Sequence, residues 1–266
     1  MDLHTITAVR RPGSRSELAL GPGTTVLAGG TWLFSEPQLD LHTLVDLGGL
    51  GWPPLEVTGS GLTIAATCTL RRLAAFRGPG EWSALPLLHQ CCAALAGSFK
   101  IWHEATVGGN ICLGLPAGPM IALTVALDGV AVVWPAGGGE RRMAVAELVT
   151  GVRRTALGPG DVLRAVEIPA SALRARTAYQ RIALSPLGRS AALVIGRRGE
   201  DDRFSMTVTA ATERPYQLCF PTVPTAQELT SALAGISRWC ADVHGARDWR
   251  EHVTGLLAEK IRGALS

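Results

Sequence analysis

The sequence predicts an α+β protein of two parts, and three observations support this prediction. Short strand-like and helix-like segments follow one another along the whole chain of 266 residues, a length that suits two domains or one large one. A break is expected at 169–175, which opens on a proline. Beyond it, three strand-like segments come first and helices follow, which is typical of an α+β domain. We therefore expect a first domain over 1–168, with subdomains of about 1–52 and 53–168, and a second domain over 169–266.

The composition describes a chain with a large core and few charges. Hydrophobic residues make up 47% and charged residues 18%, so the chain can bury a sizeable core and is not a disordered segment. The low charge also suggests that partners cover some apolar surface. The net charge of +3 includes arginines that are scattered with few aromatics beside them, so no nucleic-acid-binding track is expected.

Neither a membrane span nor a secretory signal is expected. The longest apolar stretch, Met120–Leu127, is too short to cross a bilayer. The N-terminus carries an acidic residue at position 2 and lacks the apolar region of a signal peptide. The sequence therefore predicts a cytoplasmic protein.

The first subdomain is predicted from three strand-like segments. Thr5–Arg10 alternates enough for an edge strand, Thr24–Ala28 is β-branched and apolar, and Thr43–Leu47 is a further short strand. Pro12–Gly23 lies between the first two, and its prolines and glycines leave no room for an ordinary helix with its connections. A small sheet without a helix in this interval is expected.

The second subdomain is predicted to begin with a hairpin, in which Gly59–Gly61 turns between strands within Glu56–Ala66. A helix is then expected after a Thr67 or Thr69 cap, and another over Pro86–Ala96, where apolar residues recur at helical spacing. The remaining elements are a helix, a strand, a short helix and a strand, over Pro116–Leu127, Val130–Trp134, Val145–Val149 and Val162–Ile168.

The tail is predicted to hold three strands and two helices. The strands are expected at Ala178–Leu184, Ala191–Arg197 and Phe204–Ala210. The helices are expected at Ala226–Leu233 and Asp248–Leu265, the second with apolar residues near one face. A three-stranded sheet plus helices is therefore expected in this domain.

Two glycine-rich loops are the most informative functional signal. The first is Val26–Thr31 and the second is Ala105–Asn110, and each places a Gly-Gly pair beside a threonine. Paired glycines allow positive φ and let a ligand approach the backbone, and successive N–H groups in such a bend can bind an anion. The hydroxyls of Thr31 and Thr106 and the amide of Asn110 add hydrogen-bonding groups. Together the loops suggest a divided anion site, such as one that holds the diphosphate of a dinucleotide from both sides.

The two loops lack the common nucleotide-binding fingerprints. Neither matches G-x-G-x-x-G after a strand or G-x-x-x-x-G-K-[ST], so a Rossmann site and a P-loop are not predicted. Each loop taken alone is equally well explained as a tight turn. Metal binding is not predicted, because the six cysteines and six histidines lack the spacing of ligands. The cysteines are expected to be buried free thiols.

Further segments accompany the two loops. The first loop continues into Trp32-Leu33, and Leu44–Leu47, Gly151–Asp161 and, more weakly, Asp248–Arg250 follow along the chain. With the loops, these segments resemble the FAD-binding (medium) subunit of molybdenum hydroxylases, the family of xanthine dehydrogenase and carbon monoxide dehydrogenase. The resemblance covers most of the chain. It implies a two-part FAD-binding domain of the PCMH type, followed by a smaller α+β C-terminal domain.

The resemblance also points to residues that would contact the cofactor. Most lie in the two loops; Leu157 lies in a segment that the family places near the flavin, and Arg189 could place a charge near the ring. The candidates for cofactor binding are Leu27, Ala28, Gly29, Gly30, Thr31, Trp32, Thr106, Gly108, Gly109, Asn110, Leu157 and Arg189. Ordinary packing for Leu157 and a solvated loop charge for Arg189 are the alternatives. No catalytic side chain and no metal ligand is predicted in this chain.

The sequence departs from the family pattern in three places. Trp32 stands where the family has an aspartate, and its indole can only donate a hydrogen bond. Leu115–Pro119 replaces a segment that carries a serine and an aspartate, and Pro12–Gly23 replaces a helix. Binding through backbone amides needs none of these features.

For function, the resemblance implies an electron relay. In this family, substrate is oxidised at a molybdenum cofactor in a large subunit. Electrons then pass through [2Fe–2S] centres in a small subunit to noncovalently bound FAD, and from FAD to an external acceptor. This chain would be the FAD subunit of a heterotrimer with those two partners. The heterotrimer could pair into a dimer of heterotrimers. The resemblance leaves open which substrate is oxidised and which acceptor takes the electrons. The alternatives are a self-contained FAD-dependent reductase, which would need its own acid, and a flavin-free scaffold.

Overall fold

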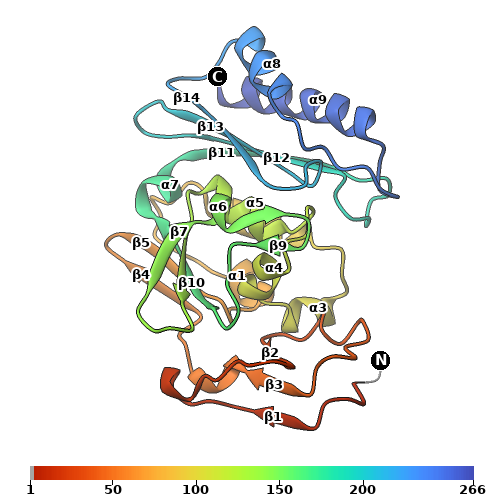
Figure 1. The fold of residues 1–266 in the computed structure, drawn as a ribbon. Helices are drawn as coiled ribbons and strands as arrows, with labels where there is room; N and C mark the ends of the chain where they lie inside the picture. The colour runs from red at the N-terminus through yellow and green to blue at the C-terminus, as the bar shows by residue number, and fades with distance from the viewer. Residues whose placement is uncertain (1–2) are drawn as a thin grey trace.

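A computed structural model describes residues 3–266 as three modules stacked one above another (Figure 1). The first module, at the bottom of the figure, carries the N-terminal sheet. The second carries a five-stranded sheet with short helices, and the third, at the top, carries a C-terminal sheet and two helices. The predicted α+β class is confirmed. The domain boundaries stay a prediction. Strand β10 (Val162–Pro169) crosses the expected boundary at residue 168 by one residue, since it ends at Pro169.

A small parallel sheet forms the first module. Its strands are β1 (Ala8–Arg10), β2 (Thr24–Leu27) and β3 (Thr43–Asp46), in the order β1-β3-β2. Between β1 and β2 the chain forms only the 3-10 helix η1 (Arg15–Glu17), in agreement with the prolines and glycines there. A second 3-10 helix, η2 (Leu47–Leu50), follows β3. β2 runs directly into the first glycine loop.

The second module is built on an antiparallel sheet in the order β4-β5-β10-β6-β7. Its strands are β4 (Leu55–Thr58), β5 (Gly61–Ala65), β6 (Val130–Trp134), β7 (Arg141–Ala144) and β10 (Val162–Pro169). The helices are α1 (Leu70–Ala74), α2 (Leu85–Ala93), α3 (Phe99–Glu104), α4 (Val107–Leu113), α5 (Pro119–Ala126) and α6 (Val145–Leu148). A short ribbon, β8 (Val149–Gly151) and β9 (Arg154–Thr155), follows α6.

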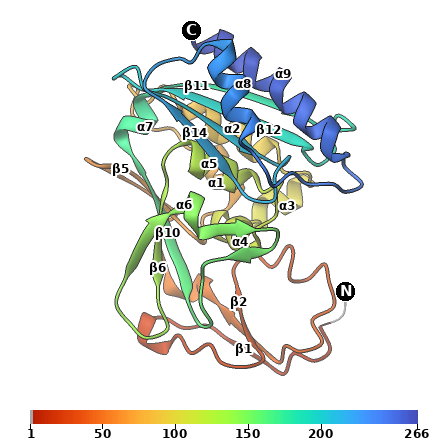
Figure 2. The same ribbon diagram turned by 45° about the horizontal axis from the view of Figure 1, so that its top comes forward.

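The third module is an antiparallel sheet with helices on its outer face (Figure 2). The strands, in sheet order, are β11 (Arg176–Ile182), β12 (Ala192–Arg198), β13 (Phe204–Thr209) and β14 (Tyr216–Phe220). The two helices of this module are α8 (Ala226–Ala234) and α9 (Arg247–Leu265), and the short helix α7 (Ala170–Arg174), which precedes β11, contacts β5 and β10 of the second module. The long helix α9 packs on β11 and β12, and α5 contacts β12 and β13. The sheet is therefore covered by helices from both sides.

Two details of the predicted secondary structure are wrong. The C-terminal sheet has four strands and not three, because Tyr216–Phe220 forms an edge strand against β13. This run is short and only partly buried, so its strand conformation depends on pairing with β13, which the local pattern does not show. The second glycine segment is not a loop, since Val107–Leu113 is helical.

The core joins the second and third modules through α5. All eight residues of α5 are buried, because the helix lies between the C-terminal sheet and the helices α2, α4 and α6 of the second module. A helix that is apolar all round suits this position. Along residues 3–266, no helix is both long and apolar enough to traverse a lipid bilayer.

Candidate functional site

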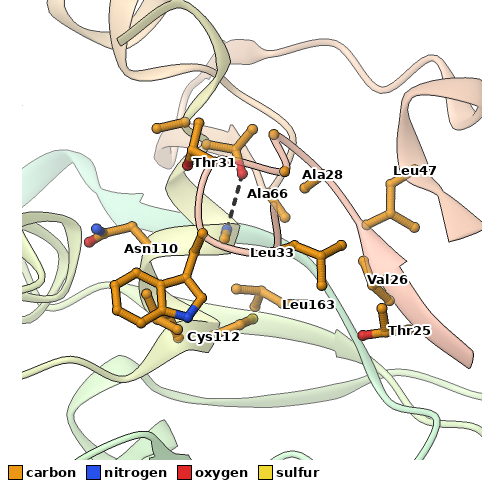
Figure 3. A pocket seen from close by; sticks show the side chains of 18 of the residues that line it. Thr25, Val26, Ala28, Thr31, Leu33, Leu47, Ala66, Asn110, Cys112 and Leu163 are labelled. Carbon is orange, nitrogen blue, oxygen red and sulfur yellow. Dashed lines mark hydrogen bonds between the residues drawn. The ribbon is translucent and has the colours of Figure 1, made fainter. Parts of the chain in front are cut away.

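A crevice of about 990 Å³ lies between the first and second modules. One wall comes from β2 and the loop after it, and the other comes from α4, β10 and the segment 157–160. Figure 3 shows Thr25, Ala28 and Thr31 of the first module around the same hollow as Asn110 and Cys112 of α4. The volume is that of a site for a large small-molecule ligand. Both glycine segments therefore meet at one place.

Gly29 brings the two glycine segments into backbone contact. A Cβ built at Gly29 would lie 1.8 Å from the carbonyl oxygen of Glu104 and 3.2 Å from the Cα of Ala105. Glu104 directly precedes the second segment and Ala105 opens it, so the first loop rests on the chain where that segment begins. Only a residue without a side chain allows such an approach. The two bends lie side by side, as the sequence predicts.

The second glycine segment is the first turn of α4. Thr106 is its N-cap, and the hydroxyl oxygen accepts a hydrogen bond from the Gly109 N–H at 3.1 Å. The Gly108 N–H donates to the carbonyl oxygen of Ala66 at 2.9 Å, and the Val107 N–H is taken up by a neighbouring carbonyl in the same way. These three N–H groups are not free for a ligand.

The first glycine loop keeps its N–H groups free. Among the residues that the structure describes, the N–H groups of Gly29, Gly30, Thr31 and Trp32 have no acceptor. Gly30 has a φ of +67°, and its carbonyl oxygen accepts from the Phe34 N–H at 2.8 Å, which closes the bend. Four successive free N–H groups at the edge of a crevice can bind an anion.

The sequence suggests that both segments hold an anion, but they use their backbone N–H groups in different ways. Of the four glycines, only Gly30 has a positive φ. Gly29 and Gly108 are required because other atoms come close: a Cβ at Gly108 would lie 2.4 Å from the Cβ of Ala66. The first segment leaves the N–H groups of its glycine pair without acceptors beside the crevice, whereas the second uses its N–H groups to build and seat α4.

The predicted polar side chains differ in what they can still offer. The Oδ1 of Asn110 accepts from the Met120 N–H at 3.0 Å and so caps the start of α5, which leaves the amide NH2 group for a ligand. The Thr106 hydroxyl oxygen is engaged by the α4 cap, but its hydrogen can still be donated. The Thr31 side chain lines the crevice, and its hydroxyl makes no hydrogen bond within residues 3–266.

The remaining predicted residues fall into two groups. Ala28, Leu157 and Arg189 line the crevice together with the loops. Leu157 also packs against the core, and Arg189 comes from the β11–β12 connection, so the third module reaches the crevice there. Leu27 does not line the crevice, although its neighbours Val26 and Ala28 do. A cofactor contact of the Leu27 side chain is therefore not supported.

Trp32 lies next to the free N–H groups. Its indole N–H is buried and has no acceptor in the described part of the chain. The Arg153 guanidinium lies over the indole ring, 5.5 Å from its centroid, and 3.5 Å from the Glu36 carboxylate. These three side chains connect the first module to the second beside the crevice.

The crevice is also lined by several residues that were not predicted from the sequence as site residues. The Asp161 carboxylate accepts hydrogen bonds from the Gly158 N–H at 3.0 Å and the Arg141 guanidinium at 2.9 Å, and so fixes the segment 157–160. Cys112 and Leu163 also line the crevice. Asp161 lies in a segment that carries the family resemblance, but nothing in its spacing identifies it as part of the site. Cys112 and Leu163 give no signal beyond their apolar character.

The crevice favours an anion and offers no obvious nucleophile. Its lining carries the cations of Arg153 and Arg189, while the carboxylate of Asp161 is paired with Arg141. Burial raises the pKa of the Cys112 thiol to about 12, so the thiol stays neutral near pH 7. Within residues 3–266, no group of three or more His, Cys, Asp or Glu side chains could hold a metal ion.

Comparison with known proteins agrees with this geometry. The family model of the FAD binding domain in molybdopterin dehydrogenase matches residues 12–171, more than half of the chain. The carbon monoxide dehydrogenase medium chain of Afipia carboxidovorans is 30% identical over 168 residues, which cover 61% of this chain and 57% of that one. The match thus spans a little over half of the length of this relative.

Solved structures share the fold along nearly the whole chain. Quinoline 2-oxidoreductase from Pseudomonas putida 86 contains a chain with a TM-score of 0.82 at 20% identity, over 100% of this chain and 98% of that one. Carbon monoxide dehydrogenase from Oligotropha carboxidovorans contains one with a TM-score of 0.83 at 22% identity, over 100% of both chains. At these identities the likeness shows the fold.

The fold and the crevice define a two-part module of the kind that holds a dinucleotide between its subdomains. The chain belongs to the family of FAD-binding domains of molybdopterin dehydrogenases, which are oxidoreductases. The assignment made from the sequence is confirmed, and with it FAD as the cofactor of this type of domain.

Proposed function

We propose that this chain holds FAD noncovalently in the crevice and serves as the electron-transfer subunit of a molybdenum hydroxylase complex. The observation that carries the proposal is the run of four free N–H groups from Gly29 to Trp32, beside a crevice that both glycine segments form. Hydrogen bonds to a charged group contribute about 1.5–3 kcal/mol each, so a few of them suffice for tight binding after ordering losses.

The residues of the crevice fit FAD in three respects. The free N–H groups of the first loop match the oxygens of a diphosphate. The closeness of Gly29 to Glu104 keeps side-chain atoms out of the contact between the two walls. The cation of Arg189 adds to the attraction for an anion.

Chemistry in such a site belongs to the cofactor: when bound, FAD supplies the ability to accept electrons and to pass them on. The protein binds and orients it. Among the described lining residues, the one carboxylate is that of Asp161. Its Oδ2 accepts from Gly158 and Arg141, and its Oδ1 accepts from the Ala136 N–H at 3.2 Å. A reductase that acts alone would need a free acid beside the ring, so this arrangement favours the relay over the self-contained reductase.

The proposed partners are a large subunit with the molybdenum cofactor and a small subunit with [2Fe–2S] clusters. The relatives support this choice, since the matching chain of Afipia carboxidovorans is the medium chain of a carbon monoxide dehydrogenase. The residues that select the substrate and the external electron acceptor would lie outside the crevice described above.

Purification from the native source, with cofactor and subunit analysis, tests the proposal. We expect FAD that acid releases from this chain, together with two further polypeptides that carry molybdenum and iron. A yellow chain that purifies alone and turns over a substrate would favour the self-contained reductase. A colourless chain whose apoprotein does not take up FAD in a fluorescence titration would refute the cofactor site and favour the scaffold.

A further inference from the structure

Arg250 is a buried cation that FAD binding does not by itself require. It belongs to α9 and to the weakly matching segment Asp248–Arg250, and its residue is about 1% exposed. Burial of a guanidinium is strongly unfavourable unless hydrogen bonds replace its water. The arrangement of those bonds shows what Arg250 holds together.

The Arg250 side chain donates mainly to backbone carbonyl oxygens. Its Nε donates to Gly245 at 3.0 Å, and its Nη1 donates to Ala191 at 2.9 Å and to Ala210 at 2.6 Å. Its Nη2 pairs with the half-exposed carboxylate of Asp242. One nitrogen therefore bridges the start of β12 and the end of β13, two points that lie side by side in the sheet.

The first of these points leads to the crevice through Arg189. The Ala191 N–H donates to the carbonyl oxygen of Ile182 at 2.8 Å, which closes the base of the β11–β12 connection. Arg189 lies two residues before Ala191 in this connection and lines the crevice. Arg250 thus clamps the base of the segment that carries the one lining cation of the third module.

The second point leads to the crevice through Pro116. Ala210 has a φ of +65°, a conformation that a residue with a side chain keeps only when its surroundings hold it. Its carbonyl oxygen accepts from Arg250, and its N–H donates to the carbonyl oxygen of Pro116 at 2.8 Å. The neighbours Leu115 and Ala117 line the crevice.

We infer that Arg250 is a positioning residue for the cofactor crevice, which joins the C-terminal helix to two of its walls: the segment that carries Arg189 and the segment around Pro116. The inference depends on the proposed FAD site, because Arg250 would act on FAD only through these walls. On this inference the third module is part of the cofactor site, although most of that module lies away from the crevice.

The test combines Arg250→Lys with Arg189→Gln in a double-mutant cycle, with the dissociation constant of FAD for the apoprotein as the readout. Lysine keeps the charge but cannot bond to several carbonyls in one plane. We expect R250K to weaken FAD binding about tenfold, as for partial loss of one charge-assisted contact. In the R189Q background the effect is expected to shrink to less than about twofold, since the contact is already absent.

A matched control is Arg198→Gln. Arg198 also ties α9 to the sheet, because its Nη1 donates to the Leu265 carbonyl oxygen at 3.0 Å, but it does not line the crevice. R198Q is expected to lower the Tm of the apoprotein and to leave the affinity for FAD unchanged. Equal weakening of FAD binding by R250K in both backgrounds, or a lower Tm with unchanged affinity, would refute the Arg189 branch and leave the proposed function intact.

Hydrogen exchange tests the Pro116 branch without FAD. In apo R250K the Ala210 N–H, which donates to the Pro116 carbonyl oxygen, is expected to exchange faster than in the parent protein. In R198Q it is expected to stay protected. Unchanged protection at Ala210 in R250K would refute this branch. If R250K does not fold, Asp242→Asn replaces it, since this change weakens the hold on Nη2 and is expected to show the same pattern to a smaller extent. Absence of FAD binding by the parent protein would refute the inference and the proposed function together.

Discussion

Gly29→Ala is the change that most directly tests whether contact between the two glycine segments forms the cofactor site. The added Cβ would lie 1.8 Å from the Glu104 carbonyl oxygen and 2.7 Å from the Glu104 carbonyl carbon. Both are backbone atoms, so no side-chain rotation relieves the clash. The first loop must move away from the chain before α4 by roughly 1.5 Å or more to reach ordinary contact distance.

The magnitude follows from the cost of overpacking. Forcing one extra carbon into a well-packed contact costs about 1–3 kcal/mol. In the apoprotein the loops can separate and relieve this strain, but FAD binding has to bring them together again. Most of the cost therefore falls on affinity, and we expect the dissociation constant of FAD to rise about 5- to 150-fold. The Tm of the apoprotein is expected to change little.

The assay is titration of apoprotein with FAD by flavin fluorescence, with two comparison variants. At Gly109 a Cβ would meet only the Thr106 hydroxyl oxygen at 2.9 Å, which can rotate away at the loss of a cap worth about 1 kcal/mol. G109A is therefore expected to weaken binding about fivefold at most. At Gly137 nothing lies within 4 Å of the added carbon, so G137A should bind as the parent does. Unchanged affinity in G29A would refute the reasoning.

Three further predictions concern stability. Trp32→Phe removes a buried N–H without an acceptor, so the free energy of unfolding of the apoprotein should rise by about 1 kcal/mol in urea; a clear fall, in a background where Arg153→Gln has already removed the cation over the ring, would contradict the missing acceptor. Asp161→Asn leaves either the Ala136 N–H or both the Gly158 N–H and the Arg141 guanidinium without an acceptor, and should lower that free energy by about 1–3 kcal/mol, with faster proteolysis near 136 or 158 and not elsewhere. Burial raises the pKa of the Cys68 and Cys92 thiols from 9.0 to about 12, so the unfolded chain loses these protons first and stability should fall as the pH rises from about 9 toward 12, by about 1.4 kcal/mol per thiol and pH unit. Cys92→Ala should reduce the loss between about pH 8 and pH 10, and an identical loss in that variant would contradict the assignment.

Much of the fold follows from local pattern. Val130–Trp134 is apolar and β-branched and forms β6 over those five residues. The predicted helix over Pro116–Leu127 appears as Pro119–Ala126, because a proline is tolerated in the first turn, where its missing N–H is not needed. Elements held by tertiary contact were missed. Val107–Leu113 begins with two glycines after a valine, a poor start by helix propensity, and is seated by bonds to the strand-to-helix turn before α1.

The site was predictable in location and less so in detail. A Gly-Gly pair beside a hydroxyl indicates a bend near a ligand, and both pairs do reach one crevice. Which N–H groups stay free depends on contacts that the sequence does not display: Gly108 N–H is used because Ala66 happens to lie beside it. Leu27 was included as a neighbour in sequence, but it does not line the crevice, whereas Thr25, Val26 and Ala28 do.

The order of residues within the two segments explains why similar sequences act differently. In the second segment Thr106 precedes the glycine pair and stands three residues before Gly109, the spacing at which an N-cap hydroxyl accepts from the third helical N–H. In the first segment Thr31 follows the glycine pair, so its hydroxyl does not cap the N–H groups of the pair. The chain bends at Gly30, and the N–H groups of the pair have no acceptors. The threonine before the second pair thus engages the Gly109 N–H, while the Gly108 N–H is engaged by Ala66; the threonine after the first pair engages none of the N–H groups of its own segment. The diphosphate should accordingly accept its backbone N–H hydrogen bonds from the first loop. The second segment should contribute a wall without side chains at its glycines, which lets the diphosphate approach the first loop.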